Sequence, residues 1–499
     1  MAAKLVARLA SWVFVAVVGL LLPTNLFGQT LTGWPTESPP ASLEPAEVQF
    51  PHYDVRTLDN GMRVVAVLHH EQPIVSVRLF VGAGMAREPA DKAGLASLLA
   101  ALLDQGTTSR TAQEIAETID TIGGGLGVGD SRDLTFVNAV VMSDSFELVM
   151  EIVSDIIRYP AFAVEEIERQ RQQVVSGLQV SLQDPDYLAG IVFNRLVYGF
   201  HPYGRPQSGT PESLPTITSD NLRAFHETYF APNNSILVIV GDLTADLAFE
   251  TAQRVFGDWS PKPIDVLQVS EPPPPTHRLV VVDKPGAVQT EIRVGHIGVP
   301  RKHVDYLPLD MAVRVLGGEG SNRLHRVLRA DRGLTYSAEA SIHTLQLTGD
   351  VEARTNTRTE ATAEVLRLTI EEFWRLRRQR INARELVGVQ AYMSGSFPLQ
   401  IETPDAIAVR VLNVLFYGLD LGDLATYRER VGAVTVDDIQ RVSHEYLMPD
   451  RLSIVLVGDA SAFIDDLSGI GFTGVERVPL SDLDLSTVDL TRSGLGSSE

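Results

Sequence analysis

The sequence has no cysteine and a deficit of positive charge. The absence of cysteine excludes disulfides, thiolate zinc sites and a lipid-modified N-terminal cysteine. Lysine and arginine together number 42 against 63 acidic residues, so the formal net charge is −21. This charge argues against nucleic acids as partners, although it would suit a basic peptide. The 499 residues, 44% of them hydrophobic, are enough for two or more compact domains.

The N-terminal segment predicts export. Lys4 and Arg8 precede an apolar run from Leu9 to Leu22, and Pro23 ends that run before small and polar residues up to Gly28. This is the layout of a signal peptide at residues 1–28, because the apolar run is shorter than the about 20 residues that span a bilayer. An uncleaved anchor is the alternative. In both cases we expect a periplasmic or extracellular body, preceded by a proline-rich linker at residues 29–51.

Two distant stretches of the chain repeat each other. Residues 218–242 read TSDNLRAFHETYFAPNNSILVIVGD, and residues 435–459 read TVDDIQRVSHEYLMPDRLSIVLVGD. Each begins with a threonine that can cap a helix and ends in an apolar strand followed by Gly-Asp. They align without a gap, which indicates an internal duplication. We therefore predict an α+β fold with two duplicated lobes, each a mostly antiparallel sheet packed with helices.

The boundaries follow from composition. We predict an N-terminal lobe at 52–262, a proline-rich linker at 263–277, a C-terminal lobe at 278–477 and a mobile acidic tail at 478–499. Residues 93–107, AGLASLLAALLDQGT, predict one helix with a leucine face and a stop at Gly106. A strand at 123–129 and an Asp59-Asn60-Gly61 hairpin turn are also predicted.

Several motifs occur in a fixed order along the chain. They are TLDNGMRVV at 57–65, the Gly-Leu-Ala to Gly-Thr frame of 93–107, Ser131-Arg132-Asp133, HPYGRPQSGTPESL at 201–214, PGAVQTEIRVGHIG at 285–298, LGGEGSNRL at 316–324 and RADRGLTYS at 329–337. In this order, and with the duplication, most of residues 52–460 resembles the pitrilysin/insulinase (inverzincin) metallopeptidases. The resemblance is to the short form that pairs two chains.

The resemblance implies that the zinc site is missing. The family's active-site helix carries His-x-x-Glu-His, which supplies two zinc ligands and a general base. Here Ser97, Ala100 and Ala101 stand in those places, and the family's third ligand falls on Ser176 or Gly177. We therefore predict no metal ligand, catalytic residue or cofactor in this chain, as in the alpha subunit of the processing peptidases.

A second element of the family is present by residue type and spacing. Arg329 and Tyr336 match the Arg and Tyr with which the non-catalytic lobe holds peptide near the zinc. An arginine and a phenol can donate hydrogen bonds to a substrate carbonyl and to the oxyanion that forms from it. The alternative is a structural pair, in which the arginine caps a helix. The family's substrate-pairing edge strand corresponds to Leu126–Gly129, with Gly127 in place of an asparagine.

Three functional hypotheses remain. In the first, the chain pairs with a zinc-bearing homologue, supplies Arg329 and Tyr336, and helps bind peptide substrate for proteolysis, with no nucleic acid and no membrane span after signal cleavage. In the second, it is a metal-free peptide-binding protein or homodimer. The third is an independent enzyme with other chemistry, although no GxSxG motif supports it.

Overall fold

The computed structural model describes residues 50–318 and 322–492. The predicted signal peptide and almost all of the first linker lie outside these residues. Within the described ranges, none of the helices combines the length and the apolar character needed to cross a membrane.

Two six-stranded sheets form the framework. The first has the order β1-β2-β6-β3-β5-β4 and the second has the order β12-β7-β11-β8-β10-β9. The strands of the first are β1 (Tyr53–Thr57), β2 (Arg63–Leu68), β3 (Ile74–Val81), β4 (Gly125–Asp130), β5 (Thr135–Met142) and β6 (Ser235–Gly241). Those of the second are β7 (Arg278–Asp283), β8 (Gln289–Ile297), β9 (Ala338–Thr344), β10 (Gly349–Arg358), β11 (Ser453–Gly458) and β12 (Val475–Pro479).

Five strands of each sheet have the same topology, which confirms the predicted α+β fold with two duplicated lobes. In each lobe the last of these five strands, β6 or β11, lies parallel to the first and antiparallel to the second. The sixth strand differs. β1 joins β2 through the predicted hairpin, with Gly61 at a positive φ, whereas β12 comes from the end of the described chain and pairs parallel with β7.

Helices cover both sheets. In the N-terminal half they are α2 (Leu95–Ala100), α3 (Ala112–Thr121), α4 (Phe146–Arg158), α5 (Val164–Ser181), α6 (Pro185–Tyr198), α7 (Ser219–Tyr229) and α8 (Ala245–Phe256). In the C-terminal half they are α9 (Tyr306–Gly317), the π-helical turn η6 (His325–Ala330), α10 (Thr362–Arg378), α11 (Ala383–Ser396), α12 (Pro404–Phe416), α13 (Gly422–Ala425), α14 (Tyr427–Ala433), α15 (Val436–Tyr446) and α16 (Ile464–Gly469). Residues 259–277, which contain the proline-rich segment, form neither helix nor strand.

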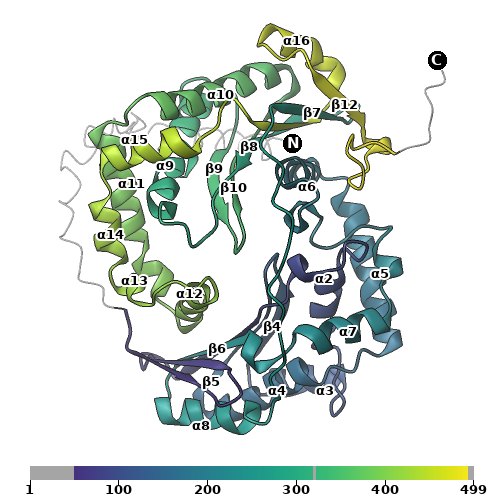
Figure 1. Ribbon diagram of the computed structural model, residues 1–499, viewed down its shortest axis with the longest axis vertical. Helices are drawn as coiled ribbons and strands as arrows, with labels where there is room; N and C mark the ends of the chain where they lie inside the picture. Colours follow the sequence, from purple (N-terminus) through teal and green to yellow (C-terminus); the bar gives the residue numbers. More distant parts are fainter. Residues whose placement is uncertain (1–49, 319–321, 493–499) are drawn as a thin grey trace, which may run out of the picture. The chain divides into compact units, whose positions relative to one another are not determined.

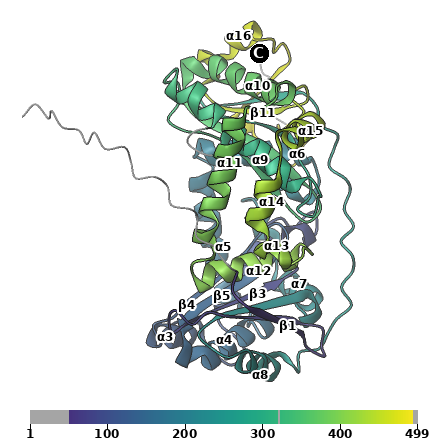
Figure 2. The ribbon, with the colours of Figure 1, turned by 90° about the vertical axis from the view of Figure 1, so that its left-hand side faces the viewer.

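Two helices are exchanged between the lobes. α6 packs on β8 and β11 of the second sheet, and α12 packs on β3 and β6 of the first sheet. Figure 1 shows α6 beside β8, and Figures 1 and 2 show α12 along the first sheet. Phe193 of α6 and Leu412 of α12 are fully buried in the two cores that result. Because each sheet buries one face under a helix of the other half, the lobes share their cores.

Two sequence predictions need correction. Regular α-helix in the 93–107 stretch ends at Ala100, and the chain continues with tighter three-residue turns, such as Leu103 N–H to Ala100 C=O, before Gly106 turns it at a φ of +108°. The prediction of a mobile tail from residue 478 is wrong for residues 478–492. β12 ends at Pro479, and Leu490 is fully buried, so apolar side chains hold this segment against the second sheet.

Candidate functional site

The helix that resembles the family's active-site helix begins with an unusual cap. Gly94 adopts a φ of +91°, and a Cβ there would lie 2.9 Å from the Cα of Gly209, so glycine is required on both counts. The first turn of α2 is capped by Glu88, which accepts hydrogen bonds from the N–H of Ala96 at 2.7 Å and of Gly94 at 3.2 Å. Burial raises the pKa of Glu88 to about 8.

A second carboxyl, which is half-buried, lies beside Ser97. Asp130, the last residue of β4, receives hydrogen bonds from the side chains of Ser97 and Gln207, the latter at 3.3 Å. Burial nevertheless raises the pKa of Asp130 to about 6. The negative charge of Asp130 repels that of Glu88 and thereby also raises the pKa of Glu88. The place of the zinc motif therefore holds two carboxyls that protonate more readily than usual, and Ser97 is bound to one of them.

The residues at the matched positions do not suit zinc. Ala100 and Ala101 offer no ligand atom, and a serine hydroxyl such as that of Ser97 is a poor zinc ligand. α5 lies next to α2, but its Ser176 and Gly177 are exposed, and nothing lies within 4 Å of a Cβ placed on Gly177. No step through a bound metal follows from this arrangement.

Within residues 50–318 and 322–492, three side chains of metal-binding type come together elsewhere, on β9 and β10. Donor atoms of His343, Asp350 and Glu352 lie within 4.8 Å of one another. Arg293, however, already neutralises Glu352 at 2.7 Å. Asp350 accepts hydrogen bonds from the Tyr198 hydroxyl at 2.5 Å and from Nδ1 of His343 at 2.9 Å. The Tyr198 bond joins the two halves of the chain, and the three bonds together already engage the carboxylates that a cation would need.

The same histidine bears on the hypothesis of an independent enzyme. The Ser341 hydroxyl lies 3.3 Å from Nε2 of His343, so Ser341, His343 and Asp350 form a hydrogen-bonded series. Ser341 and His343 are alternate residues of one regular strand, β9, whereas a serine nucleophile of the GxSxG type sits on a sharp strand-to-helix turn. We assign this series of hydrogen bonds to the contact between the lobes, where Asp350 also binds Tyr198.

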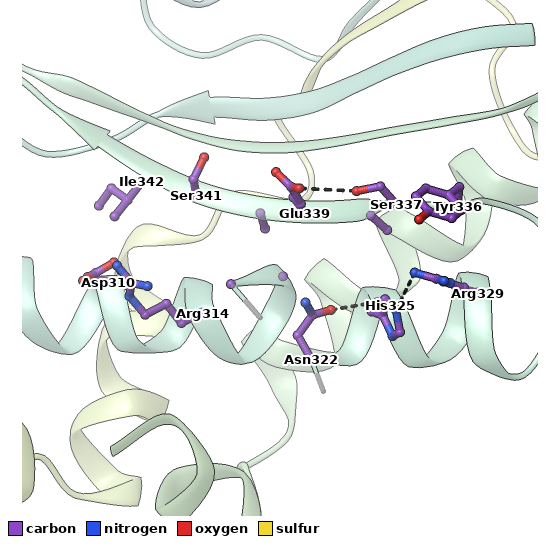
Figure 3. A pocket seen from close by; sticks show the side chains of 14 residues that line it. Asp310, Arg314, Asn322, His325, Arg329, Tyr336, Ser337, Glu339, Ser341 and Ile342 are labelled. Carbon is purple, nitrogen blue, oxygen red and sulfur yellow. Dashed lines mark hydrogen bonds and ion pairs between the residues drawn. The ribbon is translucent and has the colours of Figure 1, made fainter. Parts of the chain in front are cut away.

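Arg329 and Tyr336 come together at one end of a cavity of about 430 Å³. The guanidinium of Arg329 lies 4.6 Å from the centre of the Tyr336 ring, and its Nη1 is 3.4 Å from Nε2 of His325. Tyr336 is 79% exposed. Figure 3 shows both side chains at the same end of the cavity, with Asp310 and Arg314 of α9 at the other end. The structure therefore places the two predicted substrate-binding residues side by side and open to solvent.

The predicted peptide-pairing strand lies at the edge of its sheet. Among the described strands β4 pairs with β5 alone, so one row of its backbone hydrogen-bonding groups faces away from the sheet. Gly127 stands where the family has an asparagine, and a Cβ on Gly127 would meet the Asn138 amide at 3.0 Å. A backbone edge that can pair with an extended peptide is present without that side chain.

Two family models and several relatives match the sequence of this chain. The family described as Insulinase (Peptidase family M16) matches residues 63–207, and the Peptidase M16 inactive domain matches residues 216–393. An uncharacterized zinc protease of Mycobacterium leprae is 28% identical over 78% of this chain and 88% of its own length. The zinc protease PqqE of Helicobacter pylori is 23% identical over 83% of this chain and 94% of its own length.

Solved structures share the fold. A peptidase M16 inactive domain from Pseudomonas fluorescens superposes with a TM-score of 0.77 at 25% identity, covering 81% of this chain and 98% of that one. A protease from Helicobacter pylori superposes with a TM-score of 0.76 at 23% identity, covering 82% and 99%. Fold and site thus define a two-lobed, peptidase-like α+β protein. The chain belongs to peptidase family M16, the pitrilysin/insulinase family.

Sequence reasoning missed the two carboxyls at α2, those of Glu88 and Asp130. Asp130 could have been suspected, because it follows the glycine-rich strand directly and precedes the Ser131-Arg132-Asp133 motif. Glu88 carried no signal, since it reaches α2 only through the left-handed turn at Gly94.

Proposed function

We propose that this chain is a peptidase subunit without a zinc site of its own, which pairs with a zinc-bearing homologue and helps to bind peptide for proteolysis. The observation that carries the proposal is the pairing of Arg329 with Tyr336 at an open cavity, in a chain whose zinc positions hold Ser97, Ala100 and Ala101. Export to the cell envelope is part of the proposal and rests on the N-terminal sequence alone.

The roles of the two residues follow from their chemistry. The Tyr336 hydroxyl and the free edge of the Arg329 guanidinium can both donate to a peptide carbonyl, and more strongly to the oxyanion that develops when water adds. Stacking on the tyrosine ring orients the planar guanidinium without using its N–H groups. The pair therefore suits transition-state binding for chemistry performed on a partner's zinc.

The test uses a reconstituted complex with a zinc-bearing homologue. In Arg329→Ala and Tyr336→Phe variants, turnover of a fluorogenic peptide should fall about ten- to a thousand-fold, the range for losing an oxyanion donor. Melting temperature and complex formation should stay near the parent values, because both side chains are exposed. Arg332→Ala, which removes a nearby exposed arginine paired with Glu364, is the matched control.

Two results would count against the proposal. Unchanged turnover in both variants would remove the role of Arg329 and Tyr336. If no zinc-bearing homologue associates with the chain, the alternative is a metal-free peptide-binding protein or homodimer, for which the free edge of β4 is the supporting observation.

A further inference from the structure

The outward face of α11 is apolar and carries no charge. Residues 386–401 contain no aspartate, glutamate, lysine or arginine, and they span most of α11 and the following turn η8 (Pro398–Ile401). The inward side of the helix packs into the core of the C-terminal half through Val389 and Met393, which are both buried. Figure 2 shows α11 upright at the front of the view. The charge-free stretch therefore has one side in the core and one side on the surface.

Three large apolar side chains on this stretch face solvent. Val387 is 61% exposed, Tyr392 45% and Leu399 70%. Single exposed apolar residues are normal on a protein surface, but three that follow one another along one element form a patch. The amide of Gln390 does not interrupt the patch, because it donates to backbone carbonyls at the end of α14. An apolar surface of this kind is typical of a contact with another protein chain.

Large and small side chains alternate on this face in a self-complementary order. Ala383, Val387, Ala391 and Gly395 are all exposed and follow at four-residue steps, the spacing of the ridges with which helices pack together. If a second α11 lies antiparallel across Ala391, Val387 of one copy meets Gly395 of the other, and Leu399 meets Ala383. The space for this exists, since nothing lies within 4 Å of a Cβ placed on Gly395.

The charge of the chain favours the same contact. Two copies that each carry a net charge of −21 repel one another, so they approach closely only where neither surface bears charge. A two-fold axis brings the same patch of both copies together, and the outward face of α11 is a patch without charge.

We propose that the outward face of α11 binds a second copy of this chain, in an antiparallel, two-fold symmetric contact centred on Ala391. None of residues 383–399 lines the Arg329–Tyr336 cavity, so the contact leaves that cavity open. The inference does not rest on the proposed peptidase role.

The experiment measures the mass of the full chain in solution by sedimentation equilibrium at micromolar concentration. We expect twice the mass of one chain. In Ala391→Arg two arginines face each other across the axis, so the dissociation constant of the dimer should rise at least about a hundredfold. The melting temperature of the monomer should not change, because Ala391 is exposed. Ala116→Arg, at an exposed alanine of α3 in the other lobe, is the matched control and should remain dimeric.

A mixture of two variants tests the position of the axis. Ala391→Glu alone should dissociate like Ala391→Arg, whereas an equimolar mixture of the two should recover the dimer, because opposite charges then face each other. Failure of the mixture to recover the dimer would overturn the axis at Ala391.

Three other results would overturn the contact itself. The first is a parent chain that is monomeric. The second is a dimer that persists in Ala391→Arg, such as one joined through the apolar run from Leu9 to Leu22. The third is a chain that is monomeric alone but pairs with a zinc-bearing homologue, and loses that pairing in Ala391→Arg, because the face would then belong to the homologue.

Discussion

The two joints that connect the lobes are built alike, whereas the two regions beside the edge strands β4 and β9 are not. At one joint Arg78 of β3 binds Asp405, the second residue of α12, and at the other Arg293 of β8 binds Asp186, the second residue of α6. β3 and β8 occupy the same place in the two sheets, and both helices begin with proline. The duplication has thus kept the way in which each sheet holds a helix of the other half.

The two regions beside the edge strands have diverged in chemistry. Beside α2 and β4 the N-terminal lobe presents the buried carboxyl of Glu88 and the half-buried carboxyl of Asp130. Beside α9 and β9 the C-terminal lobe lines a cavity with side chains of both signs, Arg314 and Arg329 as well as Asp310 and Glu339, together with Tyr336. Side chains in the joints hold the fold, so they are constrained in both copies, while the side chains beside an edge strand can change as long as the backbone remains. The predictions that follow separate these two kinds of residue.

The largest effect is expected at the more buried joint. Arg293→Ala should destabilise the protein by about 3–5 kcal/mol, because it leaves Glu352 as a buried carboxylate without its cation. Chemical denaturation monitored by circular dichroism measures this change. Arg354→Ala, on the adjacent strand β10, removes an exposed pair with Glu339 and should cost less than about 1 kcal/mol. Equal effects of the two variants would contradict the distinction.

The next effect concerns the buried carboxyl of Glu88 and its dependence on pH. Folded Glu88 keeps its proton up to about pH 8, whereas an unfolded glutamate loses it near 4.5. The folded state therefore binds more protons between these values, and stability should fall as pH rises from 4.5 to 8, by up to about 4 kcal/mol from this group. Glu88→Gln should flatten the fall in melting temperature over this range.

The control for the pH experiment is Glu250→Gln, an exposed glutamate on α8. It should leave the pH profile of the parent unchanged. A Glu88→Gln variant with the same pH dependence as the parent would show that Glu88 titrates normally in the folded protein.

A smaller effect is expected at the other joint. Arg78→Ala removes a two-pronged pair with Asp405 at 2.9 and 2.8 Å, but Asp405 is 42% exposed and can be solvated once the arginine is gone. The expected loss is about 1–2 kcal/mol, the range for hydrogen bonds to a charged group. A loss as large as that of Arg293→Ala would mean that the two joints carry equal energy despite their different burial.

Much of the fold was predictable, because local sequence patterns indicate its helices and strands. The repeated stretches at 218–242 and 435–459 become α7 with β6 and α15 with β11. Arg329 and Tyr336 could be expected to meet, since only a short turn separates η6 from β9. The helix exchange could not be read from the sequence. α6 and α12 are apolar on the faces that they bury, and nothing in that pattern states which sheet receives them.

The smallest effect tests whether Gly177, where the family's third zinc ligand falls, has a structural role. Gly177 lies inside α5 and is exposed, and a side chain there would have open space, since nothing lies within 4 Å of a Cβ placed on it. Glutamate has the better helix propensity, so Gly177→Glu should stabilise the protein by about 0.5 kcal/mol, measured by denaturant titration. Such a result would show that folding does not require glycine here.

Adding Ser97→His, Ala100→Glu and Ala101→His to Gly177→Glu should then create zinc affinity. The triple variant without Gly177→Glu should lack this affinity, because only the fourfold variant offers three ligands. A destabilised Gly177→Glu variant would instead mean that this face of α5 is covered in solution, as pairing with another chain would require.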